Sequence, residues 1–278
     1  MAVQDRPCNG TNHNGSVINK ANSIIKGTIK TYTNDIGITV NGVIAEINGN
    51  IWTATVALTI GQNTIEVTAK DSSGNIDKKT ITINTETTEQ PVTITSNPQS
   101  GIAPLKTTFS IDTSISNTIT SYKIDFEGDG VTDLETTDIS NITHTYDTPG
   151  IYYPTVTATD SQNNTYTETT IINVLSKEQM DALLKGKWDG MKEALGSGDI
   201  TTALNYFSAD SKQLYSDLFT ALTSHLPQFV QDLQDIQLVY IENNMAKYRI
   251  KKSEPYGTID YPIYFVVDTD GIWRIQRY

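Results

Sequence analysis

The sequence has little cysteine and little histidine. Cys8 is its one cysteine, and the three histidines, His13, His144 and His225, lie far apart along the chain. One cysteine cannot form an internal disulfide framework, and a zinc site needs several thiolate or imidazole ligands at close spacing. The composition therefore excludes a disulfide-stapled scaffold, leaves almost no material for a zinc site, and supplies no apparent catalytic triad.

Clusters of positive charge are also missing. The 278 residues carry 20 Lys and Arg against 32 Asp and Glu, a formal net charge of −12. Nucleic-acid binders need basic clusters that displace counterions from phosphates, so nucleic acid is a poor partner for this chain. An anionic membrane surface is a poor partner for the same reason.

Long apolar runs are absent as well. None approaches the roughly 18 residues of a membrane-spanning helix, so no membrane span is predicted. Residues 1–14 are polar and lack the apolar segment of a signal peptide, which indicates either a cytosolic chain or one whose secretion signal was removed or left out. Residues 1–19 are rich in Asn and Gly and are predicted to be a flexible leader, with Cys8 as an incidental thiol.

Threonine, by contrast, is abundant and unevenly placed. Of 41 threonines, 35 precede residue 175, and residues 1–175 have a net charge of −9 against −3 for residues 176–278. Threonine is β-branched and suits the solvated face of a sheet. The two parts of the chain are therefore expected to fold differently.

Short alternating runs separated by turn residues fill residues 20–86 and again residues 92–175. Asn-Gly pairs such as Asn41-Gly42 between alternating runs are a strong hairpin signal. The polar segment 85–91 ends in Pro91 and separates the two blocks. Each block is predicted to be a small all-β sandwich.

Helical spacing begins at Ser176. Ser176 and Gln179 form a capping-box pattern, and Asp199 is placed to cap a second helix. Three helices and then four strands with polar turns are predicted over residues 176–278. The predicted fold is thus two tandem Ig-like sandwiches followed by an α+β domain, with three helices and a four-stranded antiparallel sheet.

The first block, residues 20–86, has a recognisable set of residues, namely Gly27, Ile38-Thr39-Val40-Asn41-Gly42, Trp52, Leu58, Gly61-Gln62-Asn63-Thr64-Ile65 and Ala69-Lys70-Asp71-Ser72-Ser73-Gly74-Asn75. In their order and spacing these residues resemble a bacterial Ig-like module of the glucodextranase B-domain type.

The second block, residues 92–175, has a set of characteristic segments, namely Gly101-Ile102-Ala103-Pro104-Leu105, Phe109-Ser110, Ser121-Tyr122, Asp125-Phe126, Gly128-Asp129-Gly130, His144-Thr145-Tyr146, Pro149-Gly150, Tyr152 and Val156-Thr157-Ala158-Thr159-Asp160. These segments resemble a polycystic-kidney-disease (PKD) domain, and the resemblance implies a spacer or adhesion module of an extracellular protein. Ile124 departs from the family, which usually has a tryptophan there, and this changes packing alone.

The last block, residues 176–278, has four recognisable features, namely the helix around Trp188, Gly198-Asp199-Ile200, Ala203-Leu204-Asn205-Tyr206-Phe207 and Gly271-Ile272-Trp273-Arg274-Ile275. With these features it is similar to the cone-shaped nuclear-transport-factor/ketosteroid-isomerase-like superfamily. The isomerase base and oxyanion donors match no position here, so the resemblance implies no activity.

Two candidate sites emerge. Asp125, Glu127, Asp129 and Asp133 alternate in the manner of a calcium loop, although a solvated hairpin turn explains the same residues. Calcium is the one cofactor that this spacing indicates. The candidate ligand pocket of the cone consists of aromatic residues that a filled core would also explain, namely Trp188, Phe207, Tyr248, Tyr261 and Trp273.

The leading hypothesis is a non-enzymatic bacterial surface or adhesion-type protein, extracellular or at the cell surface. Two β-sandwich spacers would present a C-terminal binding or assembly module to protein or carbohydrate. One alternative is ligand binding or enzymatic activity in the C-terminal pocket. Another is the N-terminal segment of a larger secreted Rhs-type protein with further domains.

Overall fold

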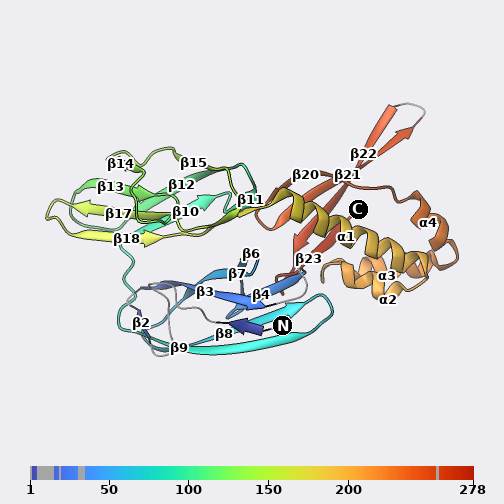
Figure 1. Cartoon of the computed structure of the whole chain (residues 1–278), viewed down its shortest axis with the longest axis horizontal. Helices are drawn as coiled ribbons and strands as arrows, with labels where there is room; N and C mark the ends of the chain where they lie inside the picture. The colour runs from blue at the N-terminus through green and yellow to red at the C-terminus, as the bar shows by residue number, and fades with distance from the viewer. Residues whose placement is uncertain (1, 5–15, 19, 31–34, 255–256) are drawn as a thin grey trace. The chain divides into compact units, whose positions relative to one another are not determined.

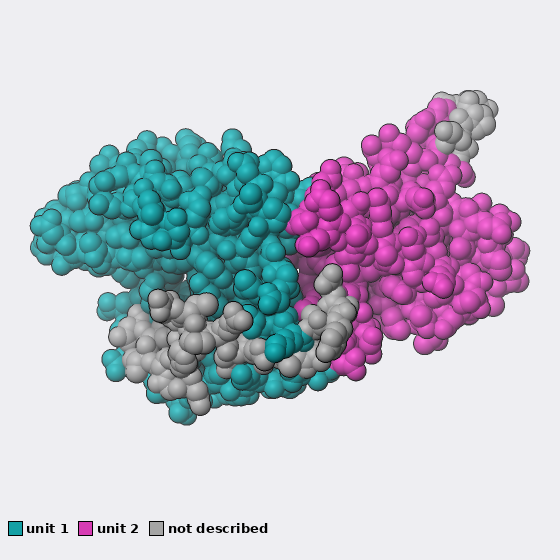
Figure 2. All heavy atoms as spheres, in the orientation of Figure 1, with its two compact units in different colours: residues 1–32, 38–69, 76–175 teal, residues 33–37, 70–75, 176–278 magenta. Residues whose placement is uncertain are grey.

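The computed structural model describes residues 2–4, 16–18, 20–30, 35–254 and 257–278 (Figure 1). It divides into two compact units, which Figure 2 shows in separate colours. Unit 1 comprises residues 1–32, 38–69 and 76–175, and unit 2 comprises residues 33–37, 70–75 and 176–278. The finer division into domains at 20–86, 92–175 and 176–278 stays a prediction.

The first β module of unit 1 consists of two sheets. One sheet has the strand order β1 (Ala2–Gln4), β3 (Asn22–Lys30), β7 (Ile51–Ala57) and β6 (Glu46–Asn48). The other has the order β2 (Ser16–Ile18), β9 (Ile76–Thr85), β8 (Gly61–Asp71), β4 (Ile36–Val40) and β5 (Val43–Ile44). The first residues of β4 and the last of β8 belong to unit 2.

Two glycines show why these residues fold in this way. Asn41 and Gly42 both have positive φ, 49° and 80°, and join β4 to β5 as the Asn-Gly signal predicts. Gly27 on β3 faces the buried Trp52 indole of β7, and a Cβ at Gly27 would overlap that ring. The close approach of the two strands therefore requires glycine at position 27.

The predicted flexible leader does not hold for its two described segments. β1 pairs antiparallel with β3, and β2 pairs parallel with β9. Both segments satisfy backbone groups that an open sheet edge would leave unpaired. Residues 1, 5–15 and 19, with Cys8 and His13, lie outside the described residues.

The second β module of unit 1 has a three-stranded and a four-stranded sheet. The first has the order β10 (Val92–Asn97), β12 (Leu105–Thr113) and β15 (Ile142–Tyr146). The second has the order β14 (Leu134–Thr136), β13 (Ile119–Asp125), β17 (Thr155–Asp160) and β18 (Thr165–Thr169). β19 (Ile172–Leu175) pairs parallel with β11 (Ser100–Ile102) and antiparallel with β16 (Gly150–Tyr152).

Pro154 separates β16 from β17, and its ring nitrogen has no N–H for a ladder. Two further strands follow: β18 pairs with β17, and β19 pairs with β11 and β16. Ile124, which replaces the usual tryptophan, is fully buried in the module's core.

Unit 2 contains the helices. They are α1 (Lys177–Gly196), α2 (Ile200–Ala203), η1 (Leu204–Tyr206), α3 (Lys212–Ala221), η2 (Thr223–His225) and α4 (Leu226–Asp232). The predicted caps are confirmed, because the Gln179 amide donates to Ser176 Oγ and the Thr202 amide donates to Asp199 Oδ1. No helix in the described part of the chain is long and apolar enough to span a membrane.

The helices are followed by four antiparallel strands. They are β20 (Gln237–Glu242), β21 (Met245–Glu254), β22 (Gly257–Val267) and β23 (Trp273–Arg277), each paired with the next. α1 packs on this meander, since the Tyr248 hydroxyl of β21 donates to Asp181 of α1 over 3.0 Å. The elements predicted for an α+β region are thus present, while the nuclear-transport-factor-like cone stays a prediction.

Candidate functional site

The acidic loop of the second β module follows β13. Asp125 accepts hydrogen bonds from the amides of Gly128 at 2.6 Å and Gly130 at 2.7 Å. Asp133 accepts from the Phe126 amide at 2.7 Å. Gly128 has φ +76°, and a Cβ there would lie 2.6 Å from the Tyr153 carbonyl oxygen. The loop is therefore built around its own backbone amides.

Three of the four predicted calcium ligands come together in this loop. Ligand atoms of Asp125, Glu127 and Asp133 lie within 4.8 Å of one another. Asp129 does not join them and accepts instead from the Val131 amide. Burial, with Asp133 close by, raises the pKa of Glu127. Carboxylate oxygens at this spacing could hold a hard cation, and calcium binding stays a prediction.

The five aromatic residues of the candidate ligand pocket differ in burial, and the pocket stays a prediction. Trp188, Phe207 and Tyr248 are fully buried, and Phe207 packs on Tyr215 with ring centroids 4.2 Å apart. Trp188 donates to the Gln234 carbonyl over 3.0 Å. These three side chains fill a core, which is the alternative that the sequence left open.

Tyr261 lies apart from this core and is 45% exposed. Tyr261 of β22 pairs with Ile250 of β21. The pairing of β22 with β23 begins only at Tyr264, so of these two neighbouring strands only β21 pairs with β22 at Tyr261. Trp273, the first residue of β23, is half-buried. The prediction of a shared aromatic pocket therefore has no support from these two positions.

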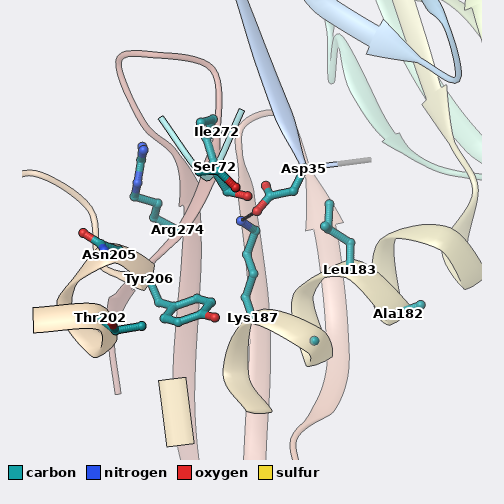
Figure 3. A pocket seen from close by; sticks show the side chains of 12 residues that line it. Asp35, Ser72, Ala182, Leu183, Lys187, Thr202, Asn205, Tyr206, Ile272 and Arg274 are labelled. Carbon is teal, nitrogen blue, oxygen red and sulfur yellow. Dashed lines mark hydrogen bonds and ion pairs between the residues drawn. The ribbon is translucent and has the colours of Figure 1, made fainter. Parts of the chain in front are cut away.

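Unit 2 does contain a pocket of about 490 Å³ elsewhere (Figure 3). Asp35, Ser72 and Ser73 line it from the segments 33–37 and 70–75. Other walls come from α1, from α2 and η1, and from Ile272 and Arg274 at the start of β23. The Ser72 amide donates to the Asp35 carbonyl, which ties the two segments together.

A buried ion pair lies in this pocket. The Lys187 ammonium of α1 donates to Asp35 Oδ2 over 2.5 Å, with 6% and 18% of the two side chains exposed. Burial lowers the pKa of Lys187, and the Asp35 carboxylate opposes that shift only in part. The pair holds α1 to the segment that contains Asp35.

A second ionic cluster adjoins the pocket. The Arg274 guanidinium donates two hydrogen bonds to the Asp270 carboxylate, at 2.6 and 2.7 Å, and a third to Asp268 at 3.0 Å. Lys70 bonds the same Asp270 carboxylate at 2.9 Å. Burial alone would raise the pKa of Asp270, but hydrogen bonds from Arg274 and Lys70 outweigh burial and hold that pKa below its ordinary value.

The pocket was missed from the sequence, although one signal was present. Lys187 falls on the buried face of α1, between Leu184 and Met191 at helical spacing. A lysine on an apolar face needs a buried partner. Its partner Asp35 lies 152 positions away, so the sequence pattern could flag Lys187 but not the pair.

Comparison with known families matches two segments of the chain. Residues 10–87 match the family described as glucodextranase, domain B, and residues 88–174 match the PKD domain family. The first two predicted modules are thereby confirmed. Modules of these two kinds are generally non-catalytic, and PKD modules are typical of extracellular proteins.

Comparison with curated proteins finds no matching relative. Among solved structures, the fibronectin(III)-like modules of Clostridium thermocellum CbhA are 14% identical, over 64% of this chain and 96% of that one, with a TM-score of 0.25. The PKD1 domain of the Vibrio cholerae metalloprotease PrtV is 26% identical, over 31% of this chain and 95% of that one, with a TM-score of 0.25.

A third similar structure is the Bacteroides ovatus protein SGBP-B of a mixed-linkage glucan utilization locus, in complex with a mixed-linkage heptasaccharide. It is 14% identical over 63% of this chain and 46% of that one, with a TM-score of 0.22.

Proposed function

We propose that the chain is a non-enzymatic binding protein of the bacterial cell surface. Its two β modules act as a spacer, and unit 2 is the binding module. The pairing of charges in the unit 2 pocket carries this proposal. General acid–base catalysis would use the charged side chains of the pocket, and these side chains are paired with one another. Here Lys187 is held by Asp35, and Arg274 by Asp268 and Asp270.

Contacts between the two β modules support the spacer role. The Asn173 amide of β19 donates to Glu46 of β6 at 2.8 Å, and the Asn48 amide of β6 donates to the Val174 carbonyl at 2.8 Å. The Lys26 ammonium lies 3.1 Å from the centre of the Tyr153 ring. Side-chain contacts of this kind restrict bending at the linker and favour a stiff spacer.

The order of elements in residues 176–278 supports a nuclear-transport-factor-like module. Helices come first, and four antiparallel strands follow. The buried rings of Trp188, Phe207 and Tyr248 give this module a filled centre. We therefore place recognition at the polar pocket, and not inside the cone.

A turnover assay tests the proposal. The purified full chain is incubated with chromogenic glycosides, esters and peptides, beside a hydrolase of known rate as a positive control. We expect no rate above buffer. An enzyme-like rate that Tyr206→Phe or Asn205→Ala abolishes would overturn the non-enzymatic assignment. Fractionation of the encoding cells tests location, and recovery in the cytosolic fraction would contradict the surface assignment.

A further inference from the structure

We propose that the unit 2 pocket binds a neutral, hydroxyl-rich ligand, of the size of one or two sugar units. This inference rests on the proposed binding function and names its ligand class. It depends on three observations about the pocket: which polar groups lack partners, how the charges are paired, and what shapes the walls.

Four neutral side chains in the pocket have no hydrogen-bond partner among the described residues. They are Ser72, Ser73, Asn205 and Tyr206. Two come from the segment 70–75 and two from η1, and the Tyr206 hydroxyl points into the pocket toward Lys187 (Figure 3). Hydroxyl and amide groups both donate and accept, as the hydroxyls of a sugar do. A saccharide can therefore pair with all four.

The charged groups, in contrast, are already paired. Lys187 and Arg274 line the pocket, yet each contacts a carboxylate at hydrogen-bond distance. With Lys70, the three cations match the three carboxylates of Asp35, Asp268 and Asp270. An anionic ligand would have to displace a buried carboxylate from its cation, which is costly. The pocket therefore favours a neutral ligand over a charged one.

The walls suit a small molecule with an apolar face. A volume of about 490 Å³ lies within the range of small-molecule sites, and the partly exposed Leu183 adds apolar surface. The Tyr206 ring lies across the pocket, and its hydroxyl rests where a Cβ at Gly190 would overlap it. Glycine at position 190 thus makes room for the tyrosine that offers both a ring and a hydroxyl.

The test measures sugar binding by the full chain. Saturation-transfer NMR and calorimetry are run with glucose, galactose, N-acetylglucosamine, cellobiose and maltose, and with glucuronate and glucosamine as charged counterparts. We expect at least one neutral sugar to bind about tenfold more tightly than its charged counterpart. Asn205→Ala and Tyr206→Phe should each weaken binding about fivefold to tenfold, because each removes one hydrogen bond.

Matched controls keep the result interpretable. Asn244→Ala removes an exposed turn amide outside the pocket, and Tyr264→Phe removes a hydroxyl on β22. Both controls should bind as the unmodified chain does, and Asn205→Ala and Tyr206→Phe should keep the melting temperature of the unmodified chain. Gly190→Ala should weaken binding by displacing Tyr206.

Three outcomes would overturn this inference. The first is tighter binding of the charged sugars, and the second is no binding of any sugar in the panel. The third is neutral-sugar binding that Asn205→Ala and Tyr206→Phe leave unchanged. That third result would place recognition elsewhere and leave the proposed binding function standing, whereas catalytic turnover would overturn the proposed function itself.

Discussion

Unit 1 and unit 2 each bring several carboxylates together, but with different partners. In the acidic loop of unit 1, Asp125 and Asp133 accept hydrogen bonds from backbone amides of the same loop. In unit 2, Asp35 and Asp270 accept from lysine and arginine side chains. The first arrangement stabilises a turn, and the second joins segments that are distant in sequence.

The difference shows how much each cluster contributes to stability. The loop lies at the surface, where solvent weakens charge interactions. The Lys187–Asp35 pair is buried, so removing one partner would leave the other charge buried without an opposite charge, which is strongly destabilising. Unit 2 should therefore depend on its ion pairs far more than unit 1 depends on its loop.

Lys187→Ala should have the largest effect on this contrast. Removing the lysine leaves Asp35 without its cation and opens a gap beside α1. We therefore expect the free energy of unfolding to fall by about 3 kcal/mol. Chemical denaturation of the full chain measures this. The matched control is Lys185→Ala, whose exposed pair with Asp181 is worth less than about 0.5 kcal/mol. Equal losses in the two variants would contradict the buried-pair interpretation.

Gly27→Ala should destabilise unit 1 by about 2 kcal/mol, because the new methyl group would overlap the Trp52 ring in a packed core. Gly186→Ala on α1 is the control, since a Cβ there meets nothing within 4 Å. Alanine favours a helix, so that control should be neutral or stabilising by up to about 1 kcal/mol. Melting curves of both variants measure the difference.

Acid should change the stability contributions of Asp270 in unit 2 and of Glu127 in the acidic loop in opposite directions. The pKa of Asp270 is held below its ordinary value of 3.8, so its contribution to stability is present above that pH and is lost as the pH falls further. The pKa of Glu127 is raised above 4.5, so acid relieves a cost instead. Between pH 5 and about 2, Asp270→Asn should flatten the decline in melting temperature. Glu127→Gln should instead raise the melting temperature slightly at neutral pH.

Calcium should have the smallest effect, and it tests the loop directly. A cation that binds only the folded state raises the melting temperature. We expect millimolar calcium to raise it and chelator to lower it, with Asp125→Asn removing the response. Asp138→Asn lies in the same module outside the carboxylate group and should keep the response. A melting temperature indifferent to calcium would leave the loop as a hydrogen-bonded turn.

Local sequence patterns predicted most of the secondary structure. Ser176 and Asp199 mark helix starts because a side chain caps an amide two or three residues on, and Asn41-Gly42 marks a hairpin because both residues accept positive φ. The acidic loop was also foreseen, since its partners lie within a few positions. Asp129 accepts from the Val131 amide, and spacing alone does not say which carboxylate oxygens face a backbone amide.

The aromatic residues show where such patterns stop. The sequence analysis placed Tyr248 and Tyr261 together in the candidate ligand pocket. In the structure, however, Tyr248 is fully buried and Tyr261 is 45% exposed. Burial depends on whether another element covers that part of the strand. The partners of β22 change along its length, which the periodicity of one strand does not contain.

The sequence by itself determined the module types, the helix caps and the turns, because each depends on residues close together in the chain. Only the tertiary structure decided that Lys187 meets Asp35 and that Ser72, Asn205 and Tyr206 share one pocket. These residues come from segments more than a hundred positions apart. A buried lysine is tolerated only where the folded chain supplies an opposite charge, and no local pattern specifies where that charge lies.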